Sequence, residues 1–211
     1  MTLLTRLFYL LAGWGSVGLV YFSSDWVQGQ GALLPHILPE TLIDRAIAYS
    51  DAAIWLYLSF FILIPCTYLV VSPARVRWLA RAMAVSALIC GVVFLLYPTT
   101  LAYPPVGDGM GWSTQMLRML QTIDSTQNCL PSLHGALTLL CAWALFERER
   151  PMRSVLAVLL TLGICYAIIA LRRHVSIDLG AGLLVGLAGG ALAKMRVSSA
   201  DRRDISPEIA P

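Results

Sequence analysis

Two short motifs place histidines at the mouths of apolar segments that are long enough to enter a membrane. The first motif is Pro131-Ser132-Leu133-His134, and the second is Arg172-Arg173-His174-Val175-Ser176-Ile177-Asp178. Ionisable side chains at a bilayer boundary are costly to place and therefore indicate function. These residues are the first candidates for chemistry in the chain.

The second motif has the spacing of a supported nucleophile. His174 and Asp178 are four residues apart, so on a helix they share a face, and Asp178 can accept a hydrogen bond from one imidazole nitrogen. The other nitrogen then keeps its lone pair, as a nucleophile requires. Arg172 and Arg173 add planar donors that match phosphate oxygens. A basic cluster at a membrane surface is the structural alternative.

The first motif has the composition of a helix start. Proline is favoured in the first helical turn and serine is a favoured N-cap, so unpaired backbone N–H groups would face out of the membrane near Ser132. Such a helix start binds anions, and His134 in the first turn could deliver a proton to a leaving oxygen. A capping serine beside an interfacial histidine is the alternative.

The composition of the chain predicts an integral membrane protein. Of its 211 residues, 58% are apolar and only 13% charged, whereas about a quarter are charged in soluble domains. Six apolar segments approach the length needed to cross hydrocarbon. They are Leu7–Phe22, Ala52–Val71, Met83–Leu101, Leu133–Phe146, Ser154–Leu171 and Ile177–Ala193. We expect an all-α protein with one six-helix domain over residues 1–196 and a disordered polar tail, residues 197–211.

The distribution of basic residues predicts the orientation. One connecting surface would carry Arg6, Arg75, Arg77, Arg81, Arg148, Arg150, Arg153, Lys194, Arg196, Arg202 and Arg203, and the other only Arg45, Arg118, Arg172 and Arg173. The richer surface is expected to be cytoplasmic, with both termini. Both histidine motifs would then face outward, into the periplasm if the membrane is a bacterial inner membrane. The net charge of +3 comes mostly from the basic residues on the expected cytoplasmic surface. It therefore indicates no nucleic-acid partner.

The connecting segments carry weaker signals. Residues 23–51 mix apolar residues with Gly and Pro, which suits either a short amphipathic helix at the interface or a simple connector. Apolar residues between Met116 and Ile123 predict one more short helix. Gly182, Gly186 and Gly190 predict close helix packing. Cys129, beside the first histidine motif, has no paired base nearby and is interpreted as structural.

Together the two histidine motifs resemble the second and third signatures of the type 2 phosphatidic acid phosphatase superfamily. Its members are typically six-helix membrane enzymes, related in their core to soluble acid phosphatases and vanadium haloperoxidases. The resemblance implies a lipid phosphate or lipid pyrophosphate as substrate, and no metal or other cofactor. By that analogy His174 forms a phosphohistidine, Asp178 orients it, and His134 protonates the leaving group. Ser132 and the two arginines before His174 would hold the phosphate oxygens.

The chain departs from the family pattern at two places. The Ser-Arg pair that commonly precedes the histidine is replaced by Ala167 and Ile168. Arg172, together with Leu inside Pro-Ser-x-His, instead resembles the branch near inositol phosphorylceramide synthases. The family's first signature, which supplies basic residues, is not found around residues 97–105. Arg118 is the candidate to supply the missing positive charge.

Several classes of protein compete with a lipid phosphatase. Formation of the phosphohistidine would also serve a phosphotransferase that passes the phosphoryl group to an alcohol. The sequence identifies neither the acceptor nor the oligomeric state. His134, His174 and Asp178 could form a metal triad, although the chain has only one other histidine, His36. Ser132 with His174 could serve an intramembrane protease. A non-enzymatic, proton-coupled transporter is the remaining alternative.

Overall fold

Helices make up most of the chain in a computed structural model that describes residues 1–31, 33–105 and 109–204. The helices are α1 (Leu3–Gly29), α2 (Leu42–Ala46), the 3-10 turn η1 (Asp51–Ala53), α3 (Ile54–Val70), α4 (Pro73–Leu96), α5 (Trp112–Ile123), α6 (Leu133–Leu145), α7 (Pro151–Ala170) and α8 (Ser176–Asp204). Two short strands, β1 (His36–Ile37) and β2 (Thr99–Thr100), pair in parallel. The predicted all-α class is confirmed.

Five helical segments are long and apolar enough to cross a membrane. They are Leu3–Gly29, Asp51–Val70, Pro73–Leu96, Pro151–Ala170 and Ser176–Lys194, with mean hydropathies between 1.5 and 2.3. The sixth predicted segment is α6, an apolar helix of 13 residues. At about 1.5 Å per residue, α6 is shorter than a hydrocarbon core of about 30 Å. The chain is therefore a membrane protein, but the predicted count of six spans is not confirmed.

Several helix boundaries differ from the predicted ones. Helix α4 begins at Pro73, ten residues before Met83, because proline is favoured at the first helical position. It ends at Leu96, two residues before Pro98, which cannot continue a helix. The backbone of α8 runs on to Asp204, past the predicted start of the polar tail; residues 205–211 lie outside the described part of the chain.

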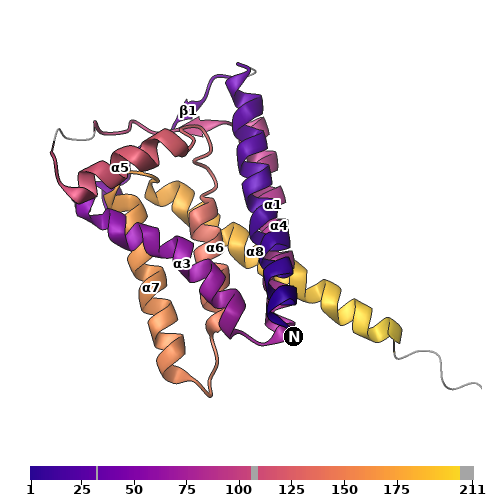
Figure 1. Cartoon of the computed structure of the whole chain (residues 1–211). Helices are drawn as coiled ribbons and strands as arrows, with labels where there is room; N and C mark the ends of the chain where they lie inside the picture. The colour runs from indigo at the N-terminus through magenta and orange to yellow at the C-terminus, as the bar shows by residue number, and fades with distance from the viewer. Residues whose placement is uncertain (32, 106–108, 205–211) are drawn as a thin grey trace, which may run out of the picture.

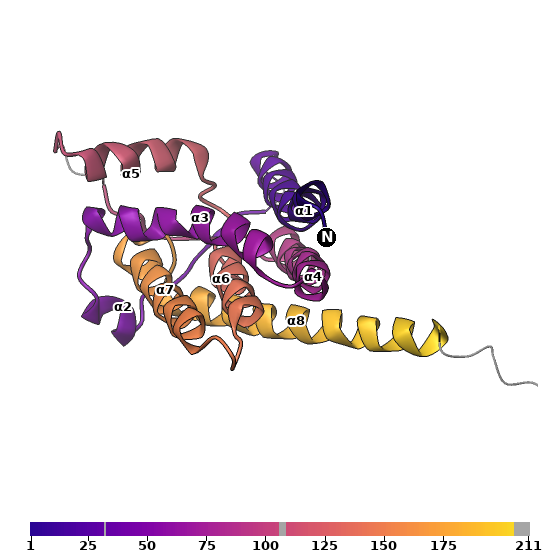
Figure 2. The same cartoon turned by 60° about the horizontal axis from the view of Figure 1, so that its bottom comes forward.

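The central helix of the bundle is α6. It packs against α8, α4, α7 and α3, while α1 lies along α4 at one edge (Figures 1 and 2). The α6–α7 turn lies at the same end as the N-terminus, and β1, α5 and the α7–α8 turn lie at the other end (Figure 1). The first residues of α6 therefore begin inside the bundle and are surrounded by other helices.

Glycines on α8 allow α6 to approach closely. A Cβ added at Gly182 would overlap the carbonyl oxygen of Ser132, and one added at Gly186 would lie 2.8 Å from that of Ala136. A Cβ at Gly190 would meet the ring of Trp143 at 2.6 Å. Small residues on one face let helix backbones come together, so the predicted role of these glycines in packing is confirmed.

Replacing Gly182 by alanine should separate α6 from α8 and destabilise the protein. Overpacking of this kind costs about 1–3 kcal/mol, and the backbone of Ser132 cannot rotate away as a side chain would. The thermal midpoint of the purified protein in detergent should fall by several degrees. Gly180→Ala is the matched control, because a Cβ there meets nothing within 4 Å. An equal loss in both variants would contradict the packing argument.

Candidate active site

His174 is held by a buried carboxylate at the start of α8. Its Nδ1 lies 2.6 Å from Oδ2 of Asp178, while Oδ1 of Asp178 accepts the backbone N–H groups of Val175 at 2.7 Å and Leu179 at 2.9 Å. Asp178 is fully buried and His174 is 6% exposed. An ionised carboxylate only accepts hydrogen bonds, so Nδ1 of His174 carries the proton and Nε2 keeps a lone pair. The predicted contact between these residues is confirmed.

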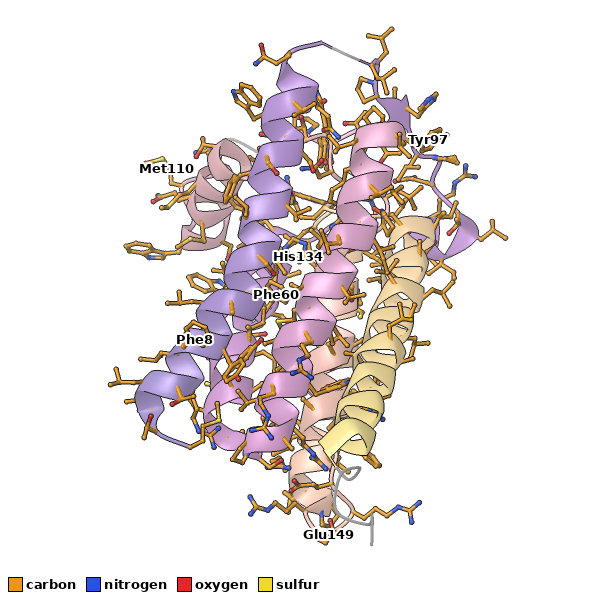
Figure 3. The ribbon with its side chains drawn as sticks, turned by 90° about the vertical axis from the view of Figure 1, so that its right-hand side faces the viewer. Phe8, Phe60, Tyr97, Met110, His134 and Glu149 are labelled. Atoms are coloured by element: carbon orange, nitrogen blue, oxygen red, sulfur yellow. The ribbon has the colours of Figure 1, made fainter. Side chains whose placement is uncertain are left out.

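The second histidine lies at the start of α6. Ser132 is the N-cap, and its hydroxyl accepts the backbone N–H of Gly135 at 3.2 Å, as the sequence predicts for a helix start. Pro131 precedes the cap instead of lying in the first turn. His134, one residue into the helix, projects among Tyr57, Phe60 and Phe61 of α3. Figure 3 shows His134 beside Phe60 inside the bundle, between Tyr97 and Glu149 at opposite ends.

The two histidines from distant parts of the chain meet directly. Nδ1 of His134 lies 3.3 Å from Nε2 of His174, and Nε2 of His134 lies 2.8 Å from the hydroxyl of Tyr57. A continuous line of hydrogen bonds therefore runs from Tyr57 through both imidazoles to Asp178. The lone pair of His174 points toward the nitrogen of His134 that can carry a proton.

Arg173 enters the same site as half of a buried ion pair. Its guanidinium lies 2.5 Å from Oδ2 of Asp124 at the end of α5 and stacks over the ring of Tyr103 at 5.0 Å. The hydroxyl of Tyr21 donates a short hydrogen bond to the other oxygen of Asp124. The side chain of Arg173 is 3% exposed, and its Nε is buried without a hydrogen-bond partner among the described residues.

The ion pair keeps both of its members charged. Burial raises the pKa of Asp124, but the charge of Arg173 and further contacts outweigh burial and hold that pKa below its ordinary value. Burial likewise opposes the charge on Arg173, yet Asp124 raises the pKa of the guanidinium above its usual range. Arg173 therefore supplies a permanent positive charge beside the histidines.

Arg172 lies outside the histidine site, contrary to the predicted phosphate contact. Helix α7 ends in a Schellman-type turn in which the N–H groups of Arg172 and Arg173 bond to the carbonyls of Ile169 and Ile168. Arg172 takes the left-handed position of this turn with a φ of 53°, where glycine is the usual residue. The turn directs consecutive arginines in different directions.

Contacts with the segment between α1 and α3 hold Arg172 in this conformation. The guanidinium of Arg172 lies 3.3 Å from Glu40 and donates to the carbonyls of Ile47 at 2.9 Å and Ile169 at 3.0 Å. A left-handed conformation costs a non-glycine residue about 1–2 kcal/mol, and these contacts offset that cost. Arg172 shapes the turn that presents Arg173 and His174.

The other two predicted phosphate ligands have different positions. Ser132 is fully buried at the cap of α6, and its backbone N–H donates to the carbonyl of Asp178 at 3.0 Å, which joins the two motifs. Arg118 is exposed on α5 and lines neither the polar pocket nor the apolar cavity described below. The structure therefore does not bring Arg118 to the histidines.

The segment between α1 and α3 braces the site. Helix α1 runs on to Gly29 at the start of this segment, and the described residues that follow it form strand β1 and the short helix α2. Asp44 of α2 is buried and accepts the backbone N–H of Ser176 at 2.7 Å and its hydroxyl at 3.0 Å. Burial opposes ionisation of Asp44, but hydrogen bonds from Thr41 and Ser176 lower its pKa. The segment thus holds the first residue of α8.

A pocket and a cavity adjoin each other at His134. A small polar pocket is lined by Tyr21, Tyr103, Asp124, Ser125, Asn128, Cys129, Leu133, His134, Arg173 and His174. A second cavity of about 310 Å³ is almost entirely apolar and is lined by Trp14, Val17, Gly18, Tyr21, Phe22, Tyr57, Phe60, Phe61, Leu120, Asp124, Leu133, His134 and Leu137. Four residues belong to both walls, among them His134 and Asp124. The polar pocket with both histidines therefore adjoins an apolar cavity of the size of a ligand pocket.

Sequence reasoning missed several residues of the site. Tyr57 lies within an apolar segment, and nothing in its position in the sequence relates it to either histidine motif. In the sequence Asp124 and Asn128 are only polar residues of a loop, although the acid could have been considered as an ion-pair partner for one of the arginines before His174. Oδ1 of Asn128 is buried without a hydrogen-bond partner among the described residues, next to the histidines.

Cys129 has a structural place in the polar pocket. Its Sγ lies 3.3 Å from the hydroxyl of Tyr103, and burial raises its pKa to about 12. A protonated thiol is a poor nucleophile, which agrees with the structural interpretation of this residue.

The geometry suits phosphoryl transfer without a metal ligand set. The described residues contain no group of three or more His, Cys, Asp or Glu side chains arranged to hold a metal ion. Asp178 already accepts three hydrogen bonds, so it supports His174 instead of completing a triad of ligands. A lone pair, an opposed proton donor and a permanent cation can together serve phosphoryl transfer through a histidine.

Comparison with known proteins agrees with this site. The family model of the PAP2 superfamily matches residues 34–192. The chain belongs to the PAP2 superfamily. The match includes both histidine motifs, Asp124 and the bracing segment from Leu34 onward. No curated protein matches the chain. Membership in the PAP2 superfamily supports an enzyme of the phosphatase or phosphotransferase type.

The two neighbouring arginines should respond differently to the same substitution. Arg173→Lys retains charge but loses the planar fork in the pocket, so turnover should fall at least about tenfold. Arg172→Lys loses the contacts to Glu40 and Ile47, so it should lower the thermal midpoint while kcat stays much closer to that of the unaltered protein. Initial rates and melting curves of both variants test this expectation, which similar losses of kcat would contradict.

Proposed function

We propose that this PAP2 protein is a membrane-embedded phosphatase that acts on a lipid phosphate or lipid pyrophosphate through a phosphohistidine. The observation that carries the proposal is the pair of opposed nitrogens, Nε2 of His174 and Nδ1 of His134, 3.3 Å apart. Asp178 leaves one as a lone pair, and the other is free to carry a proton. This is the arrangement of a nucleophile facing a general acid.

The reaction has two steps. Nε2 of His174 attacks phosphorus and forms a P–N bond, while the bond to the leaving oxygen breaks and Nδ1 of His134, acting as an imidazolium, gives that oxygen its proton and keeps its other proton on Nε2. The direct contact between the two rings must open to admit the phosphoryl group. Water then attacks the phosphohistidine, His134 takes a proton from it, and phosphate and free His174 are released. Both steps use the same groups in opposite directions.

The phosphate oxygens need donors in the polar pocket. The unpartnered Nε of Arg173 is a buried donor beside the histidines, and the first N–H groups of α6 point outward from its N-terminus. A helix N-terminus and a guanidinium both stabilise the negative charge that spreads over the transferring group. We assign oxygen binding to Arg173 and to the backbone after Ser132.

The apolar cavity supports a lipid substrate. Its wall includes Phe22 and Phe61, which are 59% and 39% exposed, so the cavity reaches the lipid-facing surface of α1 and α3. A substrate tail could lie there while its phosphate enters the polar pocket past His134. A water-soluble phosphate would leave this apolar surface uncovered.

The orientation follows from the basic residues. The end that carries the α6–α7 turn also carries the arginine-rich segments, so we place it in the cytoplasm. The end with α5 and the α7–α8 turn would then face outward, into the periplasm if the membrane is a bacterial inner membrane. Lipids of the outer leaflet would be the substrates.

Replacing His174 by alanine tests the proposed nucleophile. The purified variant should remain folded but release phosphate from lipid phosphates and pyrophosphates at least about a thousandfold more slowly than the unaltered protein, because the covalent route is lost. Assays with and without inositol or a lipid alcohol would distinguish hydrolysis from transfer to an alcohol. Full activity of His174→Ala would refute the phosphohistidine mechanism.

A substitution in the cavity tests the lipid substrate separately. Gly18→Leu should fill part of the cavity and raise KM for long-chain lipid phosphates about tenfold, since buried apolar contacts of the tail are lost. Hydrolysis of a short-chain soluble phosphate should change little. Gly15→Leu is the control, because Gly15 lies on the same helix, is exposed and does not line the cavity. Equal effects of both variants would argue against a tail in this cavity.

A further inference from the structure

Tyr57 makes a contact with His134 that the two-histidine mechanism does not use. Its hydroxyl lies 2.8 Å from Nε2 of His134, on the side of the ring away from His174. Tyr57 is 1% exposed on α3, and its ring lies 5.1 Å from the imidazole, centroid to centroid. A polar hydroxyl in an apolar helix is costly to bury unless it is paired, so this contact requires an explanation.

The direction of every hydrogen bond in the line follows from Asp178. The carboxylate can only accept, so His174 donates through Nδ1 and accepts through Nε2. The contact at 3.3 Å then requires that His134 donate through Nδ1. A neutral His134 consequently has its lone pair on Nε2, and the hydroxyl of Tyr57 is the donor to it.

We propose that Tyr57 is a positioning residue that holds the orientation of His134 in each of its protonation states. The proposal rests on the proposed function, because it gives His134 the role of proton donor. In the resting site Tyr57 donates to Nε2 of His134; once His134 is an imidazolium, Tyr57 accepts from Nε2 instead, and the proton that can leave is the one on Nδ1, the nitrogen that faces His174. The partner of His134 is thus a hydroxyl, whereas the partner of His174 is a carboxylate.

A hydroxyl suits this position because it can both donate and accept. In the resting neutral form, with its proton on Nδ1, His134 accepts the hydroxyl of Tyr57 at Nε2; in the cation, and in the neutral form left after Nδ1 has given up its proton, Nε2 carries a proton and the hydroxyl oxygen of Tyr57 accepts it. The ring therefore keeps one orientation throughout the proton cycle. Phe60 and Phe61 bound the imidazole at centroid distances of 4.8 Å and 6.5 Å, but they cannot distinguish its two nitrogens.

The variant Tyr57→Phe removes only the hydroxyl and keeps the ring. We expect kcat for a lipid monophosphate to fall about 10- to 100-fold, part of the total that a general acid contributes, with little change in KM. A lipid pyrophosphate should lose less, because its leaving phosphate needs less protonation than an alkoxide does.

Tyr68→Phe is the matched control. Tyr68 lies on the same helix, is fully buried, and donates its hydroxyl hydrogen to Met83 Sδ at 3.4 Å, away from both histidines. Both variants lose one buried hydroxyl, so a general effect on stability would appear in both melting curves. Only Tyr57→Phe should alter kcat.

A double-mutant cycle separates positioning from a structural role. In a His134→Ala background, Tyr57→Phe should have no further effect on the residual rate, because the group through which Tyr57 acts is gone. Independent effects that multiply in the double variant would overturn the proposal. So would a kcat of Tyr57→Phe equal to that of Tyr68→Phe.

The outcome is distinguishable from failure of the proposed function. If His174→Ala retained full activity, the phosphohistidine mechanism would fail whatever Tyr57 does. If activity depended on His174 and His134 but not on the hydroxyl of Tyr57, only the role of Tyr57 would be refuted.

Discussion

The buried carboxylate of Asp178 imposes the order on which the site depends. A charge inside an apolar helix bundle must have its hydrogen bonds satisfied, and Asp178 obtains them from two backbone N–H groups and from His174. Because the carboxylate accepts and never donates, it determines the tautomer of His174, then that of His134, and so the direction of the bond from Tyr57. One buried charge therefore determines the direction of the hydrogen bonds that run from Asp178 on α8 to Tyr57 on α3.

The same requirement explains the connections at the end of the bundle that carries α5 and the α7–α8 turn. Arg173 is buried beside Asp124, Asp44 binds the first residue of α8, and Arg172 reaches Glu40. Each contact joins segments that are far apart in the chain, because a polar group at this depth has few partners within its own helix. The loops are thereby tied to the turn that carries His174, and this turn gains the rigidity that a catalytic geometry needs.

The junction of the polar pocket and the apolar cavity links the chemistry to the membrane. Asp124 and His134 lie in the walls of both, so the apolar cavity is continuous with the pocket that contains Arg173 and His174. Arg173 lies in the polar pocket, with one face on Tyr103 and one nitrogen bound to Asp124. This arrangement keeps Arg173 out of the lining of the apolar cavity while leaving a donor beside His174.

The sequence by itself determined the membrane class, the helical packing through Gly182, Gly186 and Gly190, the helix near Met116, and the contact between His174 and Asp178. These features depend on composition or on residues within one or two helical turns, where spacing dictates geometry. Only the tertiary structure decided that Arg173 and not Arg172 enters the site, that Arg118 stays outside it, and that Tyr57 and Asp124 belong to it. Two adjacent arginines have identical local signals, and their directions diverge only because Arg172 adopts a left-handed conformation held by contacts with residues more than a hundred positions away.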